Sequence, residues 1–151
     1  MPSVRAALKM PGLASEAEAL WYDPQRWPAW IDGFGHVVKL EGEWPGQGAR
    51  AVWESKPGGR GRVAERVTAY EARAGQTLAV EDEQLTGTQR VTFAPGQDEV
   101  EVALELTYEL KASNVFTPLV DALFIRRALR DSLKRNLTRF ARELRADREL
   151  A

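Results

Sequence analysis

The last part of the chain carries one apolar stripe that needs a partner. From Ala122 to Leu144, apolar residues recur at steps of three and four, and charged residues fill the positions between them. That spacing indicates an amphipathic helix with a single apolar face. Thr117 and Pro118 form its expected start, as an N-cap residue followed by proline at the first helical position. Such a helix gains most of its stability by packing on another apolar surface.

The segment before this helix supplies such a surface. From Glu99 to Leu110, apolar residues alternate with glutamates, which predicts a strand with one face in the core and one in water. Similar segments, separated by turns that contain glycine or proline, are Ser3–Met10, Phe34–Glu41, Ala49–Lys56, Arg60–Glu71, Thr77–Gln84 and Gln89–Ala94. Turns at such short intervals indicate an antiparallel meander. Two of these connections, 44–48 and 58–61, are interpreted only as a turn and a hairpin.

Two short helices are expected after the first strand. Ser15 and Glu18 have the spacing of a capping box, which predicts a helix that runs to about Tyr22. Asp23 followed by Pro24 predicts the cap and first position of a second helix, which ends near Trp30. We therefore predict an α+β fold, in which a curved seven-stranded antiparallel sheet wraps around the C-terminal helix. One domain, residues 1–151, is expected.

The composition excludes several kinds of chemistry. The chain has no cysteine, which excludes disulfides, thiolate catalysis and cysteine-ligated metals. Its single histidine, His36, argues against a histidine-based metal site. No phosphate-binding or dinucleotide-binding motif is present, so neither a metal nor a cofactor is expected. Because no stretch has the length and apolarity of a signal peptide or a membrane span, we expect a cytoplasmic protein.

The segment 23–30 resembles a known family. Its sequence, Asp-Pro-Gln-Arg-Trp-Pro-Ala-Trp, is similar to the D-x-x-x-W-P-x-W marker of the polyketide cyclase/dehydrase-like branch of the START/Bet v 1-like (SRPBCC) superfamily. The order of expected elements extends the resemblance over essentially the whole chain. It implies a helix-grip fold that encloses a cavity for a small hydrophobic molecule.

The resemblance leaves three functions open. The first is binding or transport of a small hydrophobic ligand, such as a lipid, an isoprenoid or quinone, or a polyketide-like compound. The second is a cyclase, aromatase or dehydratase that uses acid–base catalysis on a polyketide-like substrate. The third is an interaction protein that docks on a ribosome or a membrane. We favour binding over catalysis, because the sequence offers no matched pair of acid and base.

Glu65 is the main candidate for chemistry. It shares strand parity with Val63, Val67 and Ala69, which are expected to face the core. A carboxyl group buried in an apolar pocket has a raised pKa and is suited to proton transfer. The alternatives are a bulge that places Glu65 in water, or a partner such as Arg62 or Arg66. His36 is a second catalytic candidate, although a lone histidine at a strand start more often lies at the surface.

The expected cavity lining combines aromatic and polar residues on the inward face. Small residues, Ala6, Ala49 and Ala51, would leave room for a ligand. The predicted ligand-binding residues are Trp30, Trp53, Glu65, Gln89, Phe93, Tyr108, Phe116, Val120, Leu123 and Phe124. The last four belong to the apolar approach to the long helix and would line a portal. The alternative is that these aromatic residues simply fill the core. For Tyr22 we favour a core position with its hydroxyl at the rim.

The long helix is basic, with nine lysines and arginines against four acids between residues 116 and 148. A basic face of this kind attracts anionic lipid or nucleic acid. Acids interrupt it, however, and would form spaced pairs such as Arg127–Asp131 and Arg139–Glu143. We therefore expect peripheral membrane contact but no nucleic-acid partner, and a monomer or weak homodimer.

Overall fold

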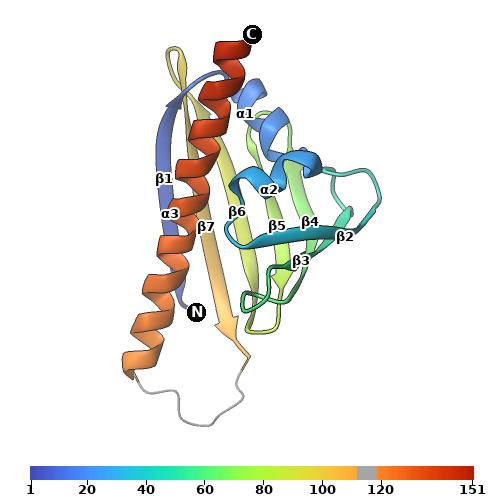
Figure 1. The fold of residues 1–151 in the computed structure, drawn as a ribbon, viewed down its shortest axis with the longest axis vertical. Coiled ribbons are helices and arrows are strands. Elements are labelled where there is room, and N and C mark those ends of the chain that lie inside the picture. The colour runs from blue at the N-terminus through green and yellow to red at the C-terminus, as the bar shows by residue number, and fades with distance from the viewer. Residues whose placement is uncertain (112–118) are drawn as a thin grey trace.

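The structure is a computed structural model that describes residues 1–111 and 119–151, without the side chains of residues 119–121. Its elements are β1 (Ser3–Pro11), α1 (Ala14–Trp21), η1 (Pro24–Arg26), α2 (Trp27–Trp30), β2 (Phe34–Glu41), β3 (Arg50–Ser55), β4 (Arg62–Glu71), β5 (Gly75–Glu81), β6 (Leu85–Pro95), β7 (Glu99–Leu110) and α3 (Leu119–Leu150). The strands form one antiparallel sheet in the order β1-β7-β6-β5-β4-β3-β2. Figure 1 shows α3 running along β1, with α1 and α2 beside it over the rest of the sheet. The predicted helix-grip fold is thus confirmed.

The apolar stripe of α3 is the centre of the core. Leu133, Leu137, Phe140 and Leu144 are each at most 5% exposed. They pack against the inward faces of the strands, where alternate residues of β7 such as Val100 are buried as the sequence predicted. The predicted start of the helix at Thr117 and Pro118 lies outside the described residues. No helix in the part of the chain described here has the length and apolarity to cross a membrane.

Of the two helix caps predicted for the short helices, one is wrong and one is confirmed. The predicted cap at Ser15 is wrong, because α1 begins two residues earlier, after Leu13. There the backbone N–H of Leu13 donates to the Glu16 carboxylate at 2.9 Å, so an acid in the first turn satisfies the helix start. The prediction for Asp23 is confirmed, because its carboxylate accepts from the Gln25 N–H at 3.0 Å and Pro24 follows it.

The sheet contains one irregularity that changes a prediction. The register between β4 and β5 shifts between Val67 and Ala69. Val67 is buried, but Ala69 is exposed and does not face the core as its parity suggested. The shift lies beyond Glu65, whose neighbours in the sheet are Ala51 on β3 and Val80 on β5. Because both neighbours are buried, Glu65 lies on the inward face, as predicted.

Ion pairs join the short helices to α3. Arg26 donates to Glu143 at 3.2 Å and to Asp147 at 3.0 Å. Arg139 donates to Asp32, which lies just after α2, at 3.3 Å. The predicted pair between Arg139 and Glu143 is therefore wrong, since each side chain reaches across to a different segment. These contacts hold η1 and the turn after α2 against the long helix.

Candidate functional site

A small cavity lies between the inward face of the sheet and the helices. Its volume is about 40 Å³. The described residues that line it are Trp21, Trp27, Trp30, Ile31, Trp44, Trp53, Arg60, Glu65, Gln76, Leu78, Gln89 and Asn136. All five tryptophans of the chain are in this set, together with one carboxyl group, one guanidinium group and three amides. The cavity therefore has an aromatic wall and a polar wall.

The aromatic wall comes from α1 and α2. The rings of Trp21 and Trp30 lie 4.2 Å apart, and both pack edge-on against Phe140 of α3. The indole N–H of Trp27 donates to the backbone oxygen of Trp21 at 2.9 Å, which fixes α2 against α1. The indole N–H of Trp30 is buried and has no hydrogen-bond partner among the described residues. An unpartnered buried donor is costly, so this wall holds a donor that an acceptor could satisfy.

The connection between β2 and β3 closes one side of the cavity. We call residues 42–48 of this connection the Trp44 loop. Trp44 packs edge-on against Trp27, with ring centroids 5.5 Å apart, and its indole N–H donates to the Tyr22 backbone oxygen at 3.1 Å. Gly42 and Gly48 lie at the ends of this loop with φ values of +77° and +88°, which favour glycine. The sequence prediction of a turn at 44–48 missed this role, because nothing local indicates where the turn will fold.

Glu65 lies on the polar wall. The indole N–H of Trp53 donates to its Oε1 at 3.2 Å, and no hydrogen bond to Oε2 occurs within the described residues. Glu65 is half-buried, and the protein around its carboxyl group keeps most of the water away from it. Burial raises the pKa of Glu65, and the charge of Arg60 and the Trp53 hydrogen bond only partly oppose that rise. A raised pKa favours the protonated acid, which donates a hydrogen bond through its O–H.

Arg60 is the charged neighbour of Glu65, and neither of the partners suggested by the sequence fills that place. Arg62 instead pairs with Glu54 at 3.1 Å, on the exposed side of the sheet. Arg66 is also exposed and lies opposite Arg50 in the register. Both side chains point away from Glu65 because their parity in β4 is opposite to its own.

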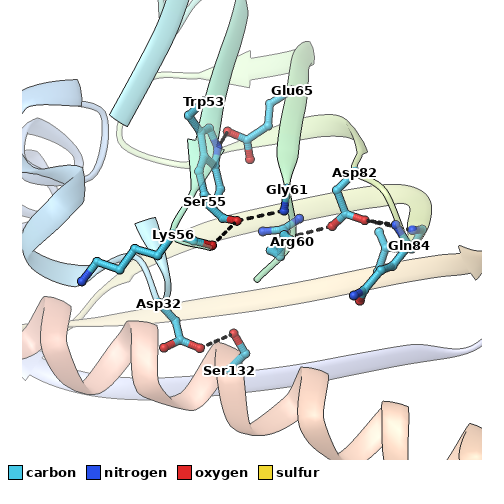
Figure 2. A network of polar contacts seen from close by, with 11 residues as sticks. Asp32, Trp53, Ser55, Lys56, Arg60, Gly61, Glu65, Asp82, Gln84 and Ser132 are labelled. Carbon is cyan, nitrogen blue, oxygen red and sulfur yellow. Dashed lines mark hydrogen bonds and ion pairs between the residues drawn. The ribbon is translucent and has the colours of Figure 1, made fainter. Parts of the chain in front are cut away.

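Arg60 is held in place by a buried acid. Its guanidinium group lies over the Trp53 ring, 5.4 Å from the centroid. Its Nε donates to Asp82 at 2.8 Å, and Asp82 exposes only 2% of its side chain. The other oxygen of Asp82 accepts from the backbone N–H groups of Gln84 and Leu85, at 2.7 and 2.9 Å. Figure 2 shows this chain of contacts leading from Glu65 through Trp53 and Arg60 to Asp82.

A second inward carboxylate, Asp32, lies outside the cavity. It accepts from Ser132 at 3.0 Å and from two arginines of α3, Arg135 at 2.9 Å and Arg139 at 3.3 Å. Its own backbone N–H donates to Asn136 at 2.7 Å. Burial alone would raise the pKa of Asp32, but the hydrogen bonds and charges of these partners hold it below its ordinary value. Figure 2 shows its contact with Ser132 on the far side of the site from Glu65.

Four of the predicted ligand-binding residues meet at the cavity: Trp30, Trp53, Glu65 and Gln89. Whether they bind a ligand stays a prediction. Phe93 and Tyr108 are not among its described lining residues, and both are buried in the core, at 3% and 2% exposure. Phe93 packs edge-on against Trp21 and Tyr22.

The remaining predicted positions lie elsewhere. His36 is exposed on β2, beside a surface groove next to the β3–β4 hairpin, and it is not among the described residues that line the cavity. Leu123 and Phe124 are 59% and 72% exposed and do not line the cavity. Phe116 lies outside the described residues, as does the side chain of Val120.

The sequence suggested that the hydroxyl of Tyr22 lies at the rim of the cavity, but the structure buries it. Tyr22 is 8% exposed, and its hydroxyl is buried without a partner among the residues described. Burial, reinforced by Tyr70 and Glu18, raises the pKa of this hydroxyl. Tyr22 is therefore a neutral member of the core that supports the Trp44 loop through its backbone oxygen.

Comparison with known proteins agrees with this architecture. A sequence model of the family described as "Polyketide cyclase / dehydrase and lipid transport" matches residues 1–145. The chain belongs to this family. No curated protein matches the sequence.

Solved structures share the fold at low sequence identity. TTHA0849 of Thermus thermophilus aligns with a TM-score of 0.72 at 19% identity, over 97% of this chain and 99% of that protein. DR_A0006 of Deinococcus radiodurans aligns with a TM-score of 0.60 at 24% identity, over 94% and 96%. The di-domain aromatase/cyclase StfQ of the steffimycin biosynthetic pathway aligns with a TM-score of 0.77 at 19% identity, over 99% of this chain and 52% of that one. At these identities, the likeness establishes the fold.

Proposed function

We propose that this protein binds a small, hydrophobic, planar molecule that carries carbonyl or similar acceptor oxygens, in the cavity between the tryptophans and Glu65. Quinones and aromatic polyketides are of this chemical class. The observation that carries the proposal is the Glu65 carboxyl group, whose pKa is raised and whose Oε2 has no partner among the described residues. As a protonated acid it would donate to an acceptor oxygen, and the Trp30 N–H is a second unpartnered donor in the described part of the wall.

The charges of the polar wall favour a neutral ligand over an anion. Arg60 already pairs with Asp82, so its charge is compensated within the protein. An anionic ligand would have to compete with Asp82 for the guanidinium group. A neutral ring with acceptor oxygens needs no such exchange and stacks on the tryptophan faces.

The volume of the cavity requires that binding be accompanied by movement. At about 40 Å³ the cavity has room for a few water molecules, whereas an apolar cavity that takes up benzene measures about 150 Å³. We propose that the ligand gains access by displacement of the Trp44 loop. At its tip, that loop is held by the Trp44–Tyr22 hydrogen bond, by the packing of Trp44 on Trp27 and by the bond at 3.1 Å from Gln76 to the Pro45 oxygen. A backbone hydrogen bond at 2.9 Å from Gly48 to Val67 holds its end to the sheet.

Two substitutions of Glu65 test the binding function. The probe is emodin, an aromatic polyketide that quenches tryptophan fluorescence when it binds nearby. Glu65→Gln keeps an N–H donor and should retain affinity, whereas Glu65→Leu removes the donor and should weaken binding by roughly tenfold. Glu109→Leu, on the exposed face of β7, is the matched control and should bind like the wild type. Absence of saturable binding to emodin and to a naphthoquinone, with no adduct in native mass spectra of protein purified from its own host, would refute the function.

Acid catalysis is a second candidate, favoured by the raised pKa of Glu65. A protonated Glu65 would donate its proton to a substrate carbonyl oxygen and so promote ring closure or loss of water. A general acid typically contributes about 10²- to 10⁴-fold to the rate. Glu65→Gln should then abolish turnover of a poly-β-ketone substrate while leaving binding intact. Equal turnover by the variant and the wild type would exclude Glu65 as the acid.

A further inference from the structure

The start of α3 exposes two large apolar side chains side by side. Leu123 is 59% exposed and Phe124 is 72% exposed. The helix is anchored here by its opposite face, where Ile125 and Leu129 are half-buried against the core. The apolar pair is therefore a feature of the outward face, and burying it in the core would require the anchored face to turn outward.

This part of α3 lies away from the short helices. Figure 1 shows α1 and α2 near the C-terminal part of α3, and the start of α3 at the opposite end of the molecule. The ion pairs that join α3 to the short helices and the Asp32 turn involve residues from Arg135 onward. The first turns of α3 thus form a surface that is separate from the contacts between α3 and the short helices.

Basic residues surround the apolar pair. We define the α3 tip as Leu123, Phe124, Arg126, Arg127, Arg130 and Lys134. Residues 123, 127, 130 and 134 follow one another at helical spacing and share a face. None of the four cations forms an ion pair among the described residues, and the predicted Arg127–Asp131 pair is absent there. Residues 121–134 contain these four cations and two acids, Asp121 and Asp131, so this part of α3 carries a net charge of +2.

We propose that the α3 tip docks on an anionic lipid bilayer, an interaction distinct from ligand binding in the cavity. Exposed phenylalanine and leucine enter the headgroup region of a bilayer, and flanking arginines and lysine bind lipid phosphates there. A nucleic acid would use the cations but gains little from the apolar pair. A protein partner would have to place an acid opposite each of several arginines, because an arginine buried without such a partner is costly.

The test is flotation of the full chain with vesicles of phosphatidylcholine, alone or with a quarter of phosphatidylglycerol. Binding is expected only with the anionic lipid, and it should fall as salt is raised. Phe124→Asp, and separately the pair Arg127→Glu and Lys134→Glu, should each weaken binding by roughly tenfold or more. These residues are exposed, so the thermal midpoint should stay close to that of the wild type.

Matched controls make the result specific to this surface. Leu40→Asp changes an apolar side chain on β2 that is 42% exposed, and Arg142→Glu reverses an exposed charge later in α3. Both should bind vesicles like the wild type. Absent or charge-independent binding would overturn the proposal, as would equal losses in the control variants. Salt-sensitive binding to a single-stranded RNA that survives Phe124→Asp would also overturn it, in favour of a nucleic-acid surface.

Discussion

Asp32 and Glu65 are both acids that point inward, yet their surroundings differ. Asp32 has a hydroxyl and two guanidinium groups as donors, with distances from 2.9 to 3.3 Å. Glu65 has one neutral donor, the Trp53 indole, at 3.2 Å. Their pKa values shift in opposite directions, because charged donors outweigh burial at Asp32 and burial outweighs its opponents at Glu65.

The contrast separates a structural acid from one that is available to a ligand. The oxygens of Asp32 are satisfied by residues of α3, so it fastens the turn after α2 to the helix. Glu65 keeps an oxygen without a partner among the described residues, in a cavity lined by aromatic rings. A satisfied charge stabilises a fold, whereas an unsatisfied polar group costs stability and is retained at functional sites.

The largest effect is expected for Asp32→Asn. Loss of the charge weakens hydrogen bonds from Ser132, Arg135 and Arg139, and we expect the free energy of unfolding to fall by about 2 kcal/mol near neutral pH. Chemical denaturation measures this change. Asp131→Asn, which alters an exposed acid of α3, should change stability by less than about 0.5 kcal/mol. Equal effects of the two substitutions would contradict the structural role of Asp32.

The pH dependence of Asp32→Asn provides a second check. Because the pKa of Asp32 is lowered in the folded protein, its stabilisation is fully present above its ordinary value of 3.8 and is lost as pH falls through the lower, folded value. The stability difference between wild type and variant should therefore shrink only in strong acid. A difference that vanishes near neutral pH would show that Asp32 is not stabilised as a carboxylate.

A smaller change in stability, of opposite sign to that of Asp32→Asn, is expected for Glu65→Gln. The pKa of Glu65 is raised in the folded protein, so wild-type stability is fully present below the ordinary value of 4.5 and declines as pH rises through the folded value. The glutamine variant lacks this decline and should be the more stable protein in mild alkali. Thermal unfolding over a range of pH measures it, with Glu109→Gln as the exposed control. Parallel curves for wild type and Glu65→Gln would remove the asymmetry between the two acids.

The smallest effect is a shift in the pKa of Glu65, which we expect for Arg60→Gln. The charge of Arg60 lowers the pKa of Glu65, so its removal should raise that pKa further. The shift should be modest, since Arg60 is partly exposed and its charge is shared with Asp82. The matched control is Arg62→Gln, which removes a charge paired with Glu54 and should leave the Glu65 titration unchanged. Equal shifts in both variants would mean that the site responds only to net charge.

Sequence reasoning succeeded for Glu65 and failed for Asp32 for a physical reason. Strand parity is a local property, so the alternation around Val63 and Val67 was enough to place Glu65 on the inward face. Asp32 gains its role from α3 residues about a hundred positions away, and no spacing within the sequence links them. Arg60 was missed likewise, because the hairpin at 58–61 was recognised but the direction of its arginine depends on Asp82 across the sheet.

The size of the cavity was also beyond the reach of the sequence. Buried small residues, Ala49 and Ala51, were correctly placed on the inward face and suggested room for a ligand. The Trp44 loop folds over that space, and tryptophan side chains fill most of it. The strand and helix order followed from periodicity, whereas the free volume depends on how large side chains from distant segments interlock.

The most direct test of this account is the titration of both acids in one experiment. Carboxyl ¹³C NMR of labelled protein, assigned with Asp32→Asn and Glu65→Gln, reports each pKa separately. We predict that the pKa of Glu65 lies above its ordinary value of 4.5 and that the pKa of Asp32 lies below its ordinary value of 3.8. A pKa of Glu65 at or below 4.5 would mean that burial does not favour the protonated acid, and would contradict the proposed site.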